Sequence, residues 1–362
     1  MKKTHLLIGF AAILLTNQAK ALNEYITWTT FENYYATGYL PRVAIDQAYG
    51  AVNIFQDPTG FADLFNQTGN NQKAANPAGL GSTLWNFQQS VNGAMGHAGS
   101  IALARGNSKY DTAIEVHQGG QDGGSALWYT TATTKLSSTY ELPVSLTWGA
   151  SQQYDTGFNP TVAVDGSSFI THSNPTIELV VEAHQAASGS SNLWYHVGWL
   201  ENPATASPTF VWGSANEYDS GYAPSITIAD GLVVEAHQGA LGSLWYRLGT
   251  VAFFTINWSP AVMYTSGYNP SVSIAGCASC GGWTIVEAHQ ADSGTGPLMY
   301  RIGNIKSLSD TTITWTPKSD TAYATGCYPS IAQNASYIVE VHEKSCNTAA
   351  NLIYSFGYFY FK

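Results

Sequence analysis

Hydrophobic residues along most of the chain form short runs of the kind that β-strands use. In PSITIAD (224–230) small and β-branched residues alternate, an Asp-Gly turn follows, and LVVEAHQ (232–238) runs back as a second strand. LWYRLG (244–249) is the last strand of such a copy, and a short run that ends at a Trp, such as FTINW (254–258), begins the next copy. No apolar pattern with the 3.6-residue period of a helix occurs beyond the N-terminal segment. The pattern therefore predicts an all-β fold.

This set of strands repeats along the chain. Its central motif, VEAHQ or a variant, recurs six times. Most copies of this motif follow a segment containing Trp, Tyr, Gly and Pro-Ser, such as WGSANEYDSGYAPS (212–225), and precede an aromatic strand such as LWYR. Four short strands in a repeat of about 50 residues are typical of a β-propeller blade. The repeats predict a propeller of six four-stranded blades, and a seventh could be assembled from the irregular first third. The central motif is VEAHQ at 181–185, 234–238 and 286–290, IEVHQ at 114–118, VEVHE at 339–343 and a decayed VNIFQ at 52–56.

The N-terminus has the features of a secretory signal peptide. Two lysines precede an apolar core at 6–15, and Ala19-Lys20-Ala21 provides small residues for cleavage. We therefore expect a signal peptide at 1–21, a single propeller domain at 22–362, and a secreted or periplasmic protein. No later apolar stretch is long enough to span a bilayer, so membrane insertion is not expected.

Cysteine usage agrees with export. The chain has four cysteines, an even number, as expected in an oxidising compartment. The Cys277-x-x-Cys280 motif and the pair Cys327 and Cys346 are therefore predicted to form disulfides rather than to bind zinc.

Composition narrows the choice of partners. Charged residues make up only 10% of the chain and aromatic residues 13%, which argues against disorder. Lys and Arg number 14 against 24 Asp and Glu, a formal net charge of −10. A surface that binds phosphates needs the opposite sign, so nucleic acids and anionic membranes are poor candidates.

The recurring Glu-x-His pair is the main candidate for chemistry. Side chains two apart in a strand share a face, so Glu235 and His237 point the same way. Blade faces pack on neighbouring blades, and a buried carboxylate there needs a partner. The candidates are the His of its own strand, Arg247 or Arg301, the Ser of Pro-Ser, and the Tyr before the Gly. A pair found in most repeats is typical of a network that maintains the fold, and contact with a sugar is the alternative.

Signatures of catalysis and of metal binding are weak. No Gly-x-Ser-x-Gly elbow occurs, and YDTGF (154–158) and YDSGY (218–222) retain only part of the Asp-box turn of sialidase-type propellers. A transition-metal site needs a third or fourth ligand close to Glu-x-His, and histidines of different blades should lie well apart. We therefore expect no catalytic residue, no metal site and no cofactor.

The stretch VVEAHQGALGSLWYR (233–247) resembles the repeats of the PLL-like β-propeller lectins, and its layout is similar to that of tectonin-type and fucose-binding propellers. The pattern covers all six copies and is clearest at 148–301. The resemblance implies a closed propeller with carbohydrate sites in clefts between adjacent blades. This chain differs in having His184, His237 and His289 where that family usually has an aromatic or aliphatic residue.

These observations together predict a non-catalytic protein that binds glycans or glycoconjugates. Trp platforms with Glu, His and Arg suit neutral sugars, and weak sites repeated around a ring gain avidity. A scaffold for protein interaction or surface assembly is the first alternative, and a hydrolase or lyase is the second; oligomers are compatible with each. The residues predicted to bind ligand are Glu182, His184, Trp194, Glu235, His237, Trp245, Arg247, Glu287, His289 and Arg301.

Overall fold

The computed structural model describes residues 24–28, 33–45, 50–58, 63–70, 85, 89–107, 110–119, 124–135, 146–165, 177–203, 205, 208–277, 281–334, 337–346 and 350–361. The predicted signal peptide at 1–21 and Cys280 lie outside these residues, so both predictions stay untested. The predicted disulfide between Cys327 and Cys346 is confirmed. Within the described ranges, no helix has the length and hydropathy needed to cross a bilayer.

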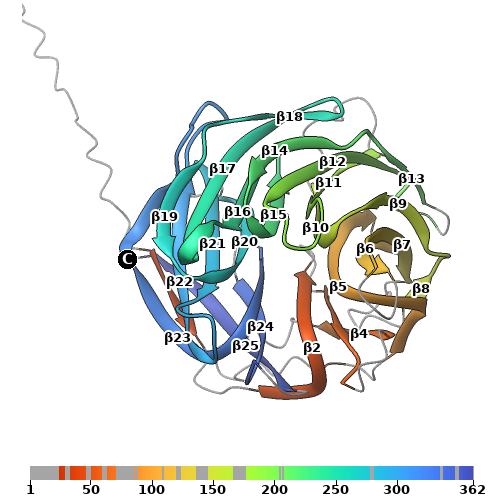
Figure 1. The fold of residues 1–362 in the computed structure, drawn as a ribbon, viewed down its shortest axis with the longest axis horizontal. Coiled ribbons are helices and arrows are strands. Elements are labelled where there is room, and N and C mark those ends of the chain that lie inside the picture. The colour runs from red at the N-terminus through yellow and green to blue at the C-terminus, as the bar shows by residue number, and fades with distance from the viewer. Residues whose placement is uncertain are drawn as a thin grey trace, which may run out of the picture.

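The described residues form antiparallel sheets around a common centre, as the all-β prediction requires (Figure 1). Two of these sheets are separate units of five strands. The first contains β10 (Phe158–Val164), β11 (Ile177–Gln185), β12 (Asn192–Glu201), β13 (Thr209–Trp212) and β14 (Asn216–Ser220). The second contains β15 (Tyr222–Ala229), β16 (Leu232–Gln238), β17 (Ser243–Ala252), β18 (Thr255–Trp258) and β19 (Val262–Ser266).

The other strands form one continuous hydrogen-bonded path. It is continuous because β2, β5 and β23 each pair along their first part with a strand of the preceding repeat and along their second part with a strand of the following one. The N-terminal β1 pairs with the C-terminal β25 and so joins the two ends of the chain. The strands are β1 (Glu24–Trp28), β2 (Asn33–Ile45), β3 (Gly50–Gln56), β4 (Asp63–Asn70), β5 (Gln89–Asn107), β6 (Tyr110–Gly119), β7 (Ala126–Lys135), β8 (Thr147–Trp148), β9 (Gln152–Thr156), β20 (Tyr268–Cys277), β21 (Gly282–Gln290), β22 (Gly296–Ile305), β23 (Thr314–Gln333), β24 (Tyr337–Glu343) and β25 (Ala350–Phe361).

The second sheet contains the predicted hairpin and aromatic strand, but the run ending at Trp258, predicted to begin the next copy, pairs with β17 and belongs to this sheet. Asp230 and Gly231 have positive φ values of 52° and 76° and make the expected tight turn between β15 and β16. The fourth strand, however, is split: β18 pairs with the second half of β17, and β19 pairs with its first half. Pro260 lies at the break and has no N–H to donate to the ladder.

One backbone distortion recurs in the innermost strands. Each contains a non-glycine residue with φ between 46° and 51°, at the point where its pairing register shifts. A cavity of about 360 Å³ at the centre is lined by residues of the strands that carry this distortion, namely β2, β5, β10, β15, β20 and β23. The two irregular N-terminal copies therefore share the geometry of the others. The distorted residues are Leu40, Ala98, Asn159, Ala223, Asn269 and Tyr328.

Neighbouring repeats are held together by two recurring contacts. A Tyr of one repeat stacks on a Trp of the next, as in Tyr218 on Trp258 with ring centroids 5.1 Å apart. The Ser of Pro-Ser, or Ser100 at the same position, accepts a hydrogen bond from the inner strand of the next repeat, as in the 3.0 Å bond from Val272 N–H to Ser225 Oγ. The same pairs occur as Tyr154 with Trp212, Tyr264 with Trp315, Tyr323 with Trp28, Ser100 with Val162, Ser271 with Ile331 and Ser330 with Val43.

Candidate functional site

The Glu-x-His pairs share a face, as the strand pattern predicts, and contact each other. In the second five-stranded sheet, Nδ1 of His237 lies 3.0 Å from Oε2 of Glu235. A carboxylate only accepts hydrogen bonds, so the imidazole donates from Nδ1 and its Nε2 faces away. Equivalent contacts of 2.8 to 3.0 Å join His117 to Glu115, His184 to Glu182, His289 to Glu287 and His342 to Glu340.

The third member of this network is the Tyr of the preceding sheet, one of the predicted partners. Tyr264 donates to Oε1 of Glu287 over 2.8 Å, and Tyr154 donates to Oε1 of Glu182 over 3.0 Å. Burial, followed by the charge of Glu287, raises the pKa of Tyr264 well above its usual value, so this phenol stays a donor. The other predicted partners do not bond to the Glu. The Ser of Pro-Ser accepts a hydrogen bond from a backbone amide, and Arg247 and Arg301 pair with aspartates.

A glycine in or directly before five of the inner strands makes room for the imidazole, while Gly38 of β2 faces Phe55 instead. A Cβ built on Gly221 would lie 2.3 Å from Cδ2 of His237 and 2.9 Å from the carbonyl oxygen of Gln238. The same collision with a His ring would occur at Gly96, Gly157, Gly267 and Gly326. The Gly before Pro-Ser and the His of VEAHQ therefore form one packing unit, which explains why the two recur together.

An aspartate lies on the outer side of three of these histidines. Oδ2 of Asp219 is 3.9 Å from Nε2 of His237 and accepts a hydrogen bond from Nε of Arg247. This Asp is not among the residues predicted to bind ligand, although YDSG (218–221) places it directly after the recurring Tyr. The side chain is 15% exposed, so the cluster opens to solvent at its carboxylate.

The next interface builds the same cluster from a different strand. Thr265 stands where Asp219 stands one repeat earlier, and Asp320 of β23 replaces the carboxylate. Asp320 pairs with Arg301, lies 3.8 Å from Nε2 of His289 and accepts a 2.7 Å hydrogen bond from Thr265. Burial alone would raise the pKa of Asp320, but the hydrogen bonds from Arg301 and Thr265 outweigh it and lower the pKa.

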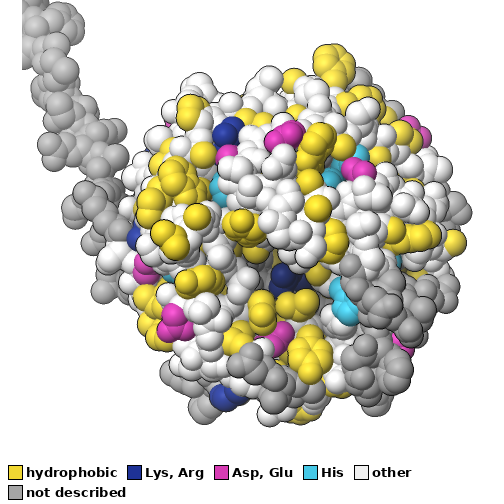
Figure 2. All heavy atoms as spheres, in the orientation of Figure 1, with side chains coloured by type: hydrophobic (Ala, Val, Ile, Leu, Met, Phe, Trp, Pro, Cys, Tyr) yellow, Lys and Arg dark blue, Asp and Glu magenta, His cyan; other side chains and the backbone are white. Residues whose placement is uncertain are grey.

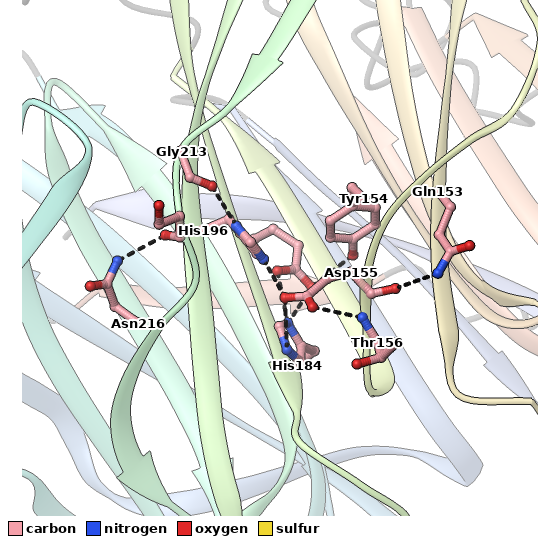
Figure 3. Close-up of polar contacts among 10 residues, drawn as sticks. Gln153, Tyr154, Asp155, Thr156, His184, His196, Gly213 and Asn216 are labelled. Atoms are coloured by element: carbon pink, nitrogen blue, oxygen red, sulfur yellow. Dashed lines mark hydrogen bonds and ion pairs between the residues drawn. The ribbon is translucent and has the colours of Figure 1, made fainter.

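The interface before β10 contains a histidine in place of the arginine. Figure 3 shows the carboxylate of Asp155 between the rings of His184 and His196. Its Oδ2 lies 2.7 Å from Nε2 of His196 and 3.8 Å from Nε2 of His184, and the side chain is 27% exposed. Burial alone would lower the pKa of His196, but the hydrogen bond with Asp155 leads the contributions that raise it. Burial alone would raise the pKa of Asp155, but the hydrogen bonds from His196 and Thr156 lower it.

The residues predicted to bind ligand are brought together on one face of each repeat, but not all reach solvent. Trp245 lies directly opposite His237 in the strand ladder and is half-buried, and Arg247 lies opposite Glu235 and is 20% exposed. Trp194 is likewise half-buried opposite His184. Ligand contact by these residues stays a prediction. The remaining predicted residues are buried, namely Glu182, His184, Glu235, His237, Glu287, His289 and Arg301.

Comparison with known proteins relates the chain to others by structure only. No protein-family model matches it, and no curated protein matches its sequence. The NanB sialidase of Streptococcus pneumoniae is similar in structure, with a TM-score of 0.57 at 9% identity over 91% of this chain and 70% of that one. The intramolecular trans-sialidase of Ruminococcus gnavus gives 0.56 at 10% identity, over 90% of this chain and 97% of that one.

The fucose-binding lectin of Aleuria aurantia, described as a six-bladed β-propeller, gives a TM-score of 0.51 at 11% identity, over 85% of this chain and 90% of that one. The fold is that of a β-propeller. At these identities the likeness concerns the fold alone, and the propeller described for the lectin agrees with the arrangement of sheets in Figure 1.

Proposed function

We propose that this chain is a secreted, non-catalytic lectin, folded as a single six-bladed propeller, that binds neutral glycans in clefts between adjacent blades. Six blades are supported by the six inner strands that share the positive-φ distortion and line one central cavity. The Aleuria aurantia lectin, which is similar in structure, has the same blade number. Secretion is supported by the disulfide between Cys327 and Cys346.

The observation that carries the proposal is the repeated polar cluster at the blade interfaces. Asp219 and Arg247 form a partly exposed acceptor and donor pair, and Trp245 lies on the same strand face as Arg247. Sugar hydroxyls bind such charged pairs, while the apolar face of a sugar ring packs on Trp. Similar clusters around one ring would gain avidity on a multivalent glycan without any tight single site.

The charge distribution favours neutral sugars over anionic ones. Figure 2 shows charged side chains scattered among hydrophobic and uncharged polar groups on the face that it draws. Of the arginines whose side chains the structure describes, Arg42 lies on β2, Arg247 on β17 and Arg301 on β22. The latter two are each paired with an aspartate, so neither is available to neutralise a ligand carboxylate.

A glycan array on the mature protein tests the proposal with two matched variants. The double variant Trp245→Ala, Arg247→Gln should lower the array signal roughly tenfold or more, because it removes one of the repeated sites that together bind a multivalent glycan. Glu235→Gln, which alters only the buried network, should lower the melting temperature and leave the array profile of the folded protein unchanged.

Two results would contradict this function. A silent array for wild-type protein, together with capture of one specific protein partner, would favour the scaffold alternative. Turnover of a glycoside that one blade's substitutions abolish would favour a hydrolase or lyase.

A further inference from the structure

The cluster of Asp155, His184 and His196 differs chemically from its two counterparts. In the next two interfaces the third member is Arg247 or Arg301, a guanidinium that stays protonated and cannot bind a metal. At this interface an imidazole takes its place, so two nitrogens and one carboxylate face a common point (Figure 3). Two His and one carboxylate are a set that divalent transition metals prefer.

The distances suit a metal ion. One ligand atom from each of the three side chains lies within 4.8 Å of the others. Bonds of 2.0 to 2.2 Å in a tetrahedral site place ligand atoms about 3.3 Å apart. The Asp155 to His196 separation of 2.7 Å must therefore widen and the Asp155 to His184 separation of 3.8 Å must shorten, each by about half an ångström.

Both imidazoles are already oriented for coordination through Nε2. Nδ1 of His184 donates to Glu182 over 3.0 Å, and Glu182 is itself held by Tyr154. Nδ1 of His196 donates to the carbonyl oxygen of Gly213 over 2.8 Å. Metal-bound histidines characteristically donate their other ring nitrogen to a carboxylate or a backbone carbonyl, and this contact fixes the ring.

We propose that Asp155, His184 and His196 bind one divalent transition-metal ion of the Zn²⁺ type, with a fourth position open to water. The two histidines are buried while the Asp155 side chain is 27% exposed, so the ion would enter from the carboxylate side. Binding replaces the proton shared by His196 and Asp155, which leaves to solvent. The inference is independent of glycan binding.

Titration of chelator-treated mature protein with Zn²⁺ by calorimetry, and with Co²⁺ by visible absorption, tests the site. We expect one ion per chain and the d–d bands of Co²⁺ bound by nitrogen and oxygen. His196→Arg copies the neighbouring interface, so it should keep the melting temperature of the metal-free protein and lower the affinity roughly 100-fold or more. Unchanged binding in this variant, or no binding by wild-type protein, would overturn the proposal.

The reverse substitution gives a gain-of-function test. Arg247 Nη1 donates to the carbonyl oxygen of Ser259 over 3.3 Å, as His196 Nδ1 does to Gly213. Arg247→His should therefore place an imidazole beside Asp219 and His237 in the same way and raise the stoichiometry from one ion to two. A folded Arg247→His variant that still binds one ion would show that the histidine does not determine binding.

Discussion

Glu343 is a charged residue in a place built for an amide, and its replacement by glutamine should stabilise the protein. The other copies of the motif end in Gln, whose side-chain oxygen accepts a hydrogen bond from the next inner strand, as Gln290 does from Tyr328 N–H over 2.9 Å. Oε1 of Glu343 accepts the same bond from Leu40 over 2.7 Å. Its Oε2 is buried and has no hydrogen-bond partner among the described residues.

The size of the effect follows from the pKa of Glu343. Burial outweighs the Leu40 hydrogen bond and the charge of Arg42, and raises this pKa from 4.5 to about 7. The folded protein therefore holds a proton that the unfolded chain releases above pH 4.5, so stability falls as pH rises from about 4.5 to about 7. At 1.36 kcal/mol per pH unit, the charged form costs about 3 kcal/mol at pH 8. That corresponds to roughly 4 °C in melting temperature for a chain of this length.

Differential scanning calorimetry at pH 4 and pH 8 measures the change in melting temperature, and urea unfolding at the same pH values measures the change in the free energy of unfolding. Glu343→Gln should gain about 3 kcal/mol at pH 8 and almost nothing at pH 4, because the glutamate is then protonated and resembles the amide. Glu201→Gln, at an exposed position, is the matched control and should change little at either pH. A gain of equal size at both pH values, or a loss at pH 8, would refute the reasoning.

Two further substitutions test the network between blades. Gly221→Ala should destabilise the protein by about 1–3 kcal/mol in urea unfolding, because the new methyl group collides with His237, whereas Gly294→Ala, with open space around it, should be tolerated; equal effects would contradict the packing unit. Tyr264→Phe should cost about 1–3 kcal/mol by the same assay, since it removes a donor from the buried Glu287, and an unchanged stability would show that the bond contributes nothing.

The central hairpin of each repeat could be predicted from sequence because it depends on local patterns. The Asp-Gly turn and the alternation in VEAHQ specify a hairpin with Glu235 and His237 on one face, and the structure has this hairpin. The Tyr partner was also predictable, since it recurs at a fixed distance before the Gly. The place of the Trp-ending run was predicted wrongly, at the start of a copy, because its pairing with the preceding aromatic strand shows only in three dimensions. The same holds for the pairing of β19 with β17.

The outer clusters depend on contacts that no single repeat contains. Asp155 contacts histidines of the following sheet, and only this contact distinguishes His196 from the other residues that follow the aromatic strand motif. Asp320 performs for His289 the role that the repeat pattern assigns to position 265. Substitutions of this kind leave the repeat pattern unchanged and alter the chemistry, so the sequence alone does not indicate that Asp155, His184 and His196 lie together.

The pairing of β1 with β25 makes ring closure the longest-range event in folding. Glu24 lies opposite Phe361, so the pairing of β1 with β25 can form only after Phe361 has been synthesised. Bringing such distant segments together is entropically costly and slow, and the edges of the last sheet stay open until then. An unfinished ring of this design exposes unpaired strand edges, so both ends must be present before the edge of β25 is covered.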